Sequence, residues 1–383
     1  MPFSAGPNIA ARPNLVFEYD TGDVANSYIG EPTTNLVNPS WTAWSVDGSG
    51  QGNIGTRTII SPYYCQIVDN TANTRQYIYV EGISASTTYT FSVQYRSIAG
   101  APTLRFQIQA YNGGSYISTM SFATTAQLGI VNNSEWQTAY ITLTTPANTN
   151  RILWFMQDGD DYVTYTHAFE LKNPQVEQKS HPTPFVVGTR SNTQGLLDVS
   201  GYGNILDLST TSYDSNAQLV FDGTDDKIIG STVVLPTANN SPMTLEAVAK
   251  TNNASGWQTV LGTSLSFRQI GFLNNNFYFG GNGGGGNLFV SGGTITAGQL
   301  YHIVMVYDGI TGYGYKNGVL VNSGNIGSNG NNNGVPLIST YTTGGGGEFL
   351  NGSVQVARVY NSALSAQEVL RNYNQLKGRF NLQ

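Results

Sequence analysis

Two groups of aspartates are the first residues in this sequence that suggest chemistry. One group comprises Asp158, Asp160 and Asp161, and the other comprises Asp222, Asp225 and Asp226. Each group follows a strand-like segment, and an aspartate in a turn accepts hydrogen bonds from its own backbone, which is the simplest interpretation. The alternative is a Ca²⁺ site with Asp222, Asp225 and Asp226 as candidate ligands, because a hard cation binds several oxygens. Neither spacing matches an EF-hand loop.

Tryptophan supplies a second candidate chemistry, because the apolar C–H face of a sugar ring stacks on an aromatic ring. Trp44 and Trp257 lie in turn-rich segments that favour exposure, and we predict them as glycan-binding candidates. Trp136 and Trp154 lie within strand-like segments, and we predict that both belong to the core.

The sequence offers no set of residues for catalysis. Its three histidines, His167, His181 and His302, and its one cysteine, Cys65, do not form a recognisable nucleophile–base set. A glycosidase needs two carboxylates, and no strand carries them at alternating positions. We therefore predict that the protein is not an enzyme, with no catalytic residue and no cofactor apart from the Ca²⁺ alternative.

Alternation of apolar and polar residues predicts strands along most of the chain. Segments such as 89–95 and 104–110 place apolar side chains on one face only, which is typical of an antiparallel sheet with one face in water. Asn317-Gly318 predicts a type I′ hairpin turn. Three glycine-rich tracts are predicted as rim loops between strands: 280–286, 324–334 and 344–347.

One helix is predicted near the C-terminus, over residues 365–378. Ser365 and Glu368 have the spacing of a capping box, which satisfies free backbone groups at a helix start. Gly378 is expected just beyond the helix, where a left-handed residue is common.

Composition excludes several classes of protein. The 383 residues include 17 Lys+Arg and 23 Asp+Glu, a net charge of −6, whereas nucleic-acid binding requires a basic surface. No apolar run approaches the roughly 18 residues of a membrane span, and we see no signal-peptide pattern. Only 10% of residues are charged, and the single cysteine allows no internal disulfide. Such a surface is common in proteins that are made in a cytosol and later exposed, virion components among them.

Segments of the C-terminal half resemble a laminin-G-like, concanavalin-type jelly roll, in the variant common in structural proteins of tailed phages. The resemblance rests on residues 219–228, 243–250, 301–321 and 349–380. The stretch VYNSALSAQEVLRNYNQLKGRF is its most specific part. The sequence departs from the family pattern at Val248, where a tryptophan is frequent, which affects only local packing.

The middle of the chain resembles the carbohydrate-binding-module-like jelly rolls of phage tail and fibre proteins. This resemblance rests on residues 35–46, 81–97, 134–144 and 173–186. Sandwich folds of these kinds host many functions, so both resemblances are specific for the fold and weak for the ligand.

The order of the segments predicts that one domain is inserted in a loop of the other. The laminin-G-like pattern opens at 15–23 and 28–34 and continues only at 196–204. Insertion at an exposed loop is tolerated because closing a longer loop costs little additional entropy. The alternative is two domains in tandem after an N-terminal arm.

The predicted fold class is therefore all-β, with two antiparallel β-sandwich (jelly-roll) domains and a short C-terminal helix. We predict an N-terminal arm at 1–14, a laminin-G-like sandwich formed by 15–33 plus 190–383, and an inserted carbohydrate-binding-module-like jelly roll at 34–189.

The resemblances imply a virion structural protein on the exterior of a phage particle, synthesised in the host cytoplasm. It would be a capsid decoration protein or a head or tail fibre component. Its expected partners are other virion proteins, further copies of itself and host-surface glycan, with no nucleic acid and no membrane. The alternative function is a glycan-binding adhesin, that is, a lectin-like receptor-binding protein.

Overall fold

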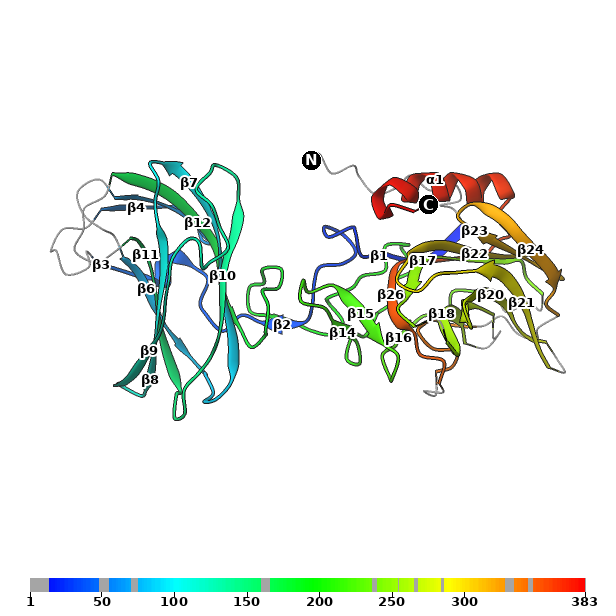
Figure 1. The fold of residues 1–383 in the computed structure, drawn as a ribbon, viewed down its shortest axis with the longest axis horizontal. Coiled ribbons are helices and arrows are strands. Elements are labelled where there is room, and N and C mark those ends of the chain that lie inside the picture. Colours follow the sequence, from blue (N-terminus) through cyan, green and yellow to red (C-terminus); the bar gives the residue numbers. More distant parts are fainter. Residues whose placement is uncertain are drawn as a thin grey trace. The chain divides into compact units, whose positions relative to one another are not determined.

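The computed structural model divides the chain into two compact units. Unit 1 comprises Met1–Pro32 and Ser191–Gln383, and unit 2 comprises Thr33–Arg190. Unit 2 is therefore one continuous stretch that lies, in sequence, between the two parts of unit 1 (Figure 1). The structure describes all residues except 1–13, 48–54, 70–74, 160–165, 236–239, 254, 265–267, 284–285, 328–333, 344–346 and 383. The predicted arm lies outside the described residues apart from Asn14.

Unit 1 contains two antiparallel sheets. In the eight-stranded sheet, the order is β14 (Ser212–Tyr213), β15 (Leu219–Asp222), β26 (Asn351–Tyr360), β17 (Met243–Thr251), β22 (Tyr301–Tyr307), β23 (Thr311–Lys316) and β24 (Val319–Asn325), with β1 (Leu15–Asp20) on β26. In the six-stranded sheet, it is β16 (Ile228–Ile229), β25 (Pro336–Ile338), β18 (Trp257–Thr263), β19 (Gln269–Leu273), β20 (Asn276–Gly283) and β21 (Gly286–Thr294). Side chains of both sheets, such as Leu245 and Phe272, form one core.

Strand β1 joins the two distant parts of unit 1. It pairs with β26, so that Tyr19 lies opposite Ala357 although the two are at opposite ends of the chain. Period-2 alternation places Phe17 and Tyr19 in the core between the sheets. Glu18 faces the other way and binds Arg358, with 2.7 Å between its Oε1 and the Arg358 Nε.

Helix α1 (Ala366–Phe380) covers the outer side of the eight-stranded sheet (Figure 1). The predicted capping box is confirmed, because Ser365 and Glu368 exchange both hydrogen bonds. Val369 and Leu376 pack the helix on this sheet. The predicted helix end is wrong: the helix continues through Gly378, and Asn381 is the left-handed residue that ends it, with φ 50°.

Unit 2 also contains two antiparallel five-stranded sheets. One has the order β10 (Gln137–Thr144), β7 (Thr88–Ala99), β12 (His167–Glu177), β5 (Tyr64–Asp69) and β4 (Thr56–Ser61). The other has the order β3 (Ser45–Asp47), β6 (Arg75–Glu81), β11 (Arg151–Asp158), β8 (Leu104–Asn112) and β9 (Ser115–Ala123). The unit also contains the 3-10 helix η2 (Trp41–Ala43) and a short pair of strands, β2 (Thr33–Thr34) and β13 (Thr189–Arg190).

The predicted fold class is confirmed: the chain is nearly all β, with antiparallel sheets arranged as sandwiches and one C-terminal helix. The predicted hairpin at Asn317-Gly318 joins β23 to β24, and both residues have positive φ. One glycine tract differs from its prediction, because residues 280–283 belong to β20 and Gly286 begins β21. Among the described residues, no helix combines the length and the apolar character that a bilayer crossing requires.

Candidate functional site

Two of the predicted candidates, Asp222 and Trp257, line the same hollow in unit 1. Asp222 ends β15 and Trp257 begins β18, so the two come from different sheets. The hollow has a volume of 460 Å³. Its other lining residues are Gly223, Thr224, Asn253, Ser255, Gln258, Gly347, Glu348, Phe349 and Asn351. The fold therefore brings an aromatic ring and several carboxylate and amide groups to one opening.

Trp257 is held as a partly exposed aromatic surface. Its side chain is 39% exposed, and its ring packs on Tyr278 and Phe289 with centroid distances of 4.9 and 5.0 Å. Gly271 allows this packing, because a Cβ at that position would lie 2.7 Å from the Tyr278 hydroxyl. The indole is thus packed against two aromatic rings and keeps a part of its surface exposed.

The buried Gln258 amide holds the loop that precedes Trp257. Its Oε1 accepts hydrogen bonds from the Asn351 backbone N–H at 3.0 Å and from the Thr251 hydroxyl at 2.9 Å. Its Nε2 donates to the carbonyls of Ser255 and Asn253. Trp257 and Gln258 both line the hollow, and the hydrogen bonds of the buried Gln258 amide fix the hollow's wall.

Glu348 provides a partly buried acceptor that also lines the hollow. Its Oε2 accepts hydrogen bonds from the Thr259 hydroxyl at 2.8 Å and from the Gln269 amide at 3.2 Å. Burial raises the pKa of the Glu348 carboxyl, although these two hydrogen bonds oppose the shift. Glu348 has φ 69°, a left-handed conformation that costs a non-glycine residue about 1–3 kcal/mol and is concentrated at functional sites.

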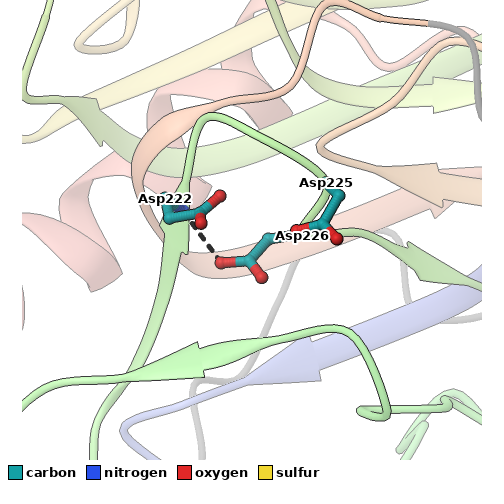
Figure 2. Close-up of side chains that lie close together, drawn as sticks. All are labelled: Asp222, Asp225 and Asp226. Carbon is teal, nitrogen blue, oxygen red and sulfur yellow. Dashed lines mark hydrogen bonds between the residues drawn. The ribbon is translucent and has the colours of Figure 1, made fainter.

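Asp222 belongs to the aspartate group with Asp225 and Asp226, and this group adopts a turn (Figure 2). The Asp222 backbone N–H donates to Asp226 Oδ2 at 2.8 Å, and Asp222 Oδ1 accepts from the Thr224 N–H at 2.7 Å. Burial raises the pKa of Asp226, against the effect of the bond from Asp222. One carboxylate oxygen from each of Asp222, Asp225 and Asp226 lies within 4.8 Å of the others. These three could therefore hold a cation, and Ca²⁺ stays a prediction.

The prediction for Trp44 is wrong, because this side chain is only 2% exposed. Helix η2 turns the chain so that Trp44 enters the core of unit 2, where its ring contacts Trp41 and Trp154. Its Nε1 donates to the Asn38 carbonyl at 3.1 Å. Both tryptophans lie in turn-rich sequence, but Trp257 is partly exposed and Trp44 is buried. A turn-rich context therefore does not predict exposure by itself.

The other candidate residues considered in the sequence do not line the hollow of unit 1. Asp158 binds His167, with 2.5 Å between Oδ2 and Nδ1, while Asp160 and Asp161 lie outside the described residues. Trp154 is fully buried, as predicted. The prediction for Trp136 is wrong: it is only partly buried and belongs to no core cluster. His302 lies opposite the core-facing residues of β22, where it is fully buried and contacts the α1 residue Tyr373.

Comparisons with known proteins support a lectin-like sandwich. Residues 222–370 match the family model described as the Concanavalin A-like lectin/glucanases superfamily. No curated protein matches the sequence significantly. The region that matches the family model includes Asp222, Trp257, Glu348 and Asn351, so the hollow lies within the lectin-like part of unit 1.

Among solved structures, the binding domain of Paraclostridial Mosquitocidal Protein 1 has 14% identity and a TM-score of 0.36, over 47% of this chain and 49% of that chain. The Trypanosoma rangeli sialidase has 17% identity and a TM-score of 0.38, over 48% of this chain and 31% of that one. A tailspike protein of bacteriophage CBA120 has 11% identity and a TM-score of 0.31, over 37% of this chain and 21% of that one. The chain thus spans half or less of each of these structures.

Proposed function

We propose that this protein binds saccharides in the hollow of unit 1 and does so without cleaving them. The observation that carries the proposal is the half-exposed Trp257, fixed by Tyr278 and Phe289, at a hollow with carboxylate and amide walls. The match of residues 222–370 to a lectin superfamily supports it.

The chemistry of the hollow suits a sugar ring. The C–H face of the ring packs on the Trp257 indole, and such aromatic contacts are worth about 0.5–1.5 kcal/mol beyond the area they bury. The sugar hydroxyl groups bond to Asp222, Asn253 and Glu348, which line the same hollow. A few placed polar groups around an apolar surface are typical of small-molecule sites.

The hydrogen bonds of the carboxylates support binding without cleavage. Hydrolysis of a glycosidic bond requires one carboxyl that gives a proton and a second that acts as base or nucleophile. Asp222 and Glu348 both line the hollow, but Asp222 Oδ1 accepts a turn hydrogen bond and Glu348 Oε2 accepts two bonds from side chains. We therefore assign these two oxygens to holding the wall, leave the other oxygen of each carboxylate to the sugar hydroxyl groups, and assign neither carboxylate to catalysis.

Trp257→Ala is expected to weaken glycan binding by about 2 kcal/mol or more, roughly thirtyfold in Kd. The reason is loss of the stacking surface, while the polar wall remains. Binding of wild type and variant to a glycan array, followed by calorimetry on the strongest neutral oligosaccharide, measures the effect.

Tyr202→Ala is the matched control, because Tyr202 is an exposed aromatic residue of unit 1 that does not line the hollow. Glycan binding by Tyr202→Ala should equal that of wild type. The oligosaccharide eluted from the wild-type protein should keep its mass, because the protein does not cleave it. Equal binding by Trp257→Ala and wild type would contradict the proposed site, and shortened oligosaccharide would contradict binding without cleavage.

We further propose that the protein works on the exterior of a phage particle, as a capsid decoration protein or fibre component, and packs against further copies of itself. The resemblances to phage structural proteins support this setting. The specific observation is edge strand β24, where Val319, Leu320 and Val321 are 61%, 49% and 38% exposed. An exposed apolar edge offers free backbone groups to another strand, and the same edge of a second copy matches it under twofold symmetry.

Val321→Lys is expected to convert an oligomer into a monomer, because a charge on an edge strand opposes strand pairing. Size-exclusion chromatography with light scattering measures the mass. Val131→Lys, at an exposed valine of unit 2, is the matched control and should keep the wild-type mass. A wild-type protein that remains monomeric at all concentrations would overturn the proposed packing.

A further inference from the structure

We propose that the hollow of unit 1 prefers saccharides that carry a free amino group, and that it binds the ammonium of such a sugar between two carboxylates and the Trp257 ring. This inference rests on the function proposed above and narrows the class of ligand for the same hollow. It also predicts something that the proposed function does not, because a saccharide site without a charge preference would bind the amine and hydroxyl forms of a sugar alike.

The hollow is lined by two carboxylates and by no cation. Asp222 and Glu348 line it, and none of its lining residues, all of which belong to the described part of the chain, is lysine, arginine or histidine. Residues 254 and 344–346, which neighbour the lining residues in sequence, are alanine and glycine and so add no charge. A hollow lined by charges of one sign attracts ligands of the opposite sign. The lining therefore favours a cationic ligand.

The negative charge extends beyond the residues that line the hollow. Asp225 and Asp226 each place a carboxylate oxygen within 4.8 Å of one from Asp222. Lys227 opposes this charge, because its ammonium lies 5.8 Å from the centroid of the Phe349 ring, which lines the hollow. Lys227 does not line the hollow itself, and one ammonium does not balance the surrounding carboxyl groups. The local excess of negative charge thus agrees with the lining.

Each lining carboxylate keeps one oxygen for a ligand. Asp222 Oδ1 accepts from the Thr224 N–H, and Glu348 Oε2 accepts from the Thr259 hydroxyl and the Gln269 amide. No hydrogen bond from a described residue reaches Asp222 Oδ2 or Glu348 Oε1. A charge-assisted hydrogen bond from an ammonium to a carboxylate oxygen is roughly twice as strong as a neutral one. An amino group therefore gains more from these two oxygens than a hydroxyl group does.

Glu348 and Trp257 each add a reason to favour an ammonium. Burial raises the pKa of the Glu348 carboxyl, against its two hydrogen bonds, and a nearby positive charge would favour the ionised form again. The Trp257 ring is 39% exposed, and the face of an indole attracts a cation through the ring's quadrupole. An anionic sugar would be repelled by the carboxylates and would gain nothing from the ring.

The other groups of the hollow favour an amino sugar over a simple ammonium compound. The C–H face of a sugar ring packs on Trp257. Asn253 and Asn351 also line the hollow and can bond to the remaining hydroxyl groups. A small alkylammonium ion presents the charge without these features, and a neutral sugar presents these features without the charge.

The test uses oligosaccharides that differ in a single group. Each amino-sugar oligosaccharide is immobilised beside its N-acetylated form and beside the form with a hydroxyl group in place of the amine. The full-length chain is the probe, in a mildly acidic buffer that keeps the amine protonated and contains a chelator, so that no metal ion neutralises the aspartates. We expect the amine form to bind more tightly than either other form by roughly tenfold or more.

Two variants assign this preference to the hollow. Glu348→Gln and Asp222→Asn each remove one charge, and each should bring the amine and hydroxyl forms closer together, to within about threefold for Glu348→Gln. Glu135→Gln is the matched control, because Glu135 is an exposed residue of unit 2 and its substitution removes the same charge. Its preference for the amine form should equal that of wild type. Equal thermal unfolding of wild type and variants excludes misfolding as the cause.

The outcomes separate this inference from the function on which it rests. Equal binding of the amine and hydroxyl forms, or a preference that survives in both Glu348→Gln and Asp222→Asn, would overturn the inference and leave saccharide binding intact. Competition by ethanolamine as strong as by the amino-sugar oligosaccharide would reveal a general ammonium site and would also contradict it. If Trp257→Ala binds the hydroxyl form as tightly as wild type, or no form binds, the proposed function itself fails.

Discussion

Arg358→Met is expected to lower the free energy of unfolding of unit 1 by about 3–5 kcal/mol. Arg358 is fully buried, and it binds Glu18 Oε1 at 2.7 Å and Glu246 Oε1 at 3.4 Å. Its removal leaves two buried carboxylates without their cation. Chemical denaturation measures the loss, and the unfolding of unit 2, which contains none of these residues, is the internal reference.

The effect is large because the network joins five elements of unit 1. Glu246 of β17 accepts hydrogen bonds from the Tyr360 hydroxyl of β26 at 2.8 Å and from the Asn372 amide of α1 at 2.9 Å. It also contacts His302 Nε2 of β22 at 2.8 Å. Through Arg358, the network reaches Glu18 in β1. The network thus fixes both the N-terminal strand β1 and the C-terminal helix α1 to the same central strands of unit 1.

The network also predicts a pH dependence. Burial alone would raise the pKa of Glu246, but the Arg358 guanidinium and the His302 contact outweigh it and lower the pKa to about 2. A carboxyl with a lowered pKa stabilises the folded state above its unfolded value of 4.5, and this stabilisation disappears as pH falls toward 2. Wild-type unit 1 should lose stability across this window, and Arg358→Met should lose less.

Arg151→Met is the matched control for this prediction. Arg151 pairs with Glu81 at 2.6 Å, but Glu81 is 66% exposed, and an exposed pair contributes about 1 kcal/mol or less. If Arg358→Met were no more destabilising than Arg151→Met, the buried network would not hold unit 1 together.

Trp44→Ala is expected to destabilise unit 2 by about 3–5 kcal/mol, which is the usual cost of truncating a large buried aromatic residue. Trp44 contacts Trp41 and Trp154 at centroid distances of 5.1 and 5.3 Å, so its removal opens a cavity among large rings. The unfolding transition of unit 2 measures the loss.

Trp44→Phe keeps an aromatic ring at the same place and should recover a part of this stability. Neutral-glycan binding by unit 1 should be unchanged in Trp44→Ala wherever unit 2 remains folded. Wild-type stability in Trp44→Ala, together with reduced glycan binding, would mean that Trp44 is a ligand contact after all.

Local features of the fold could be predicted from the sequence. The capping box at Ser365 and Glu368 requires only residues three apart, and the Asn317-Gly318 turn requires only two. The predicted end of α1 is wrong, because the helix continues through Gly378. A contact with a residue distant in sequence holds its last turn. Arg379 binds both oxygens of Asp20 in β1, a partner at the other end of the chain.

The candidate site depended on information that local pattern does not contain. Trp44 and Trp257 have similar sequence surroundings, and only tertiary packing decides which is buried. Trp136 lies just before β10, and its position on the polar face follows from the register of β10 with β7. Glu348 follows a glycine tract that the sequence marked only as a loop, so its place in the hollow was missed.

The most direct test of the proposed function is the indole N–H signal of Trp257 in a tryptophan-labelled sample, titrated with the neutral oligosaccharide that binds best. The chain has five tryptophans, and Trp257→Phe assigns the signal. We predict that the Trp257 signal shifts to saturation, while the signals of the buried Trp41, Trp44 and Trp154 stay in place. An unchanged Trp257 signal in the saturated complex would contradict a saccharide site in this hollow.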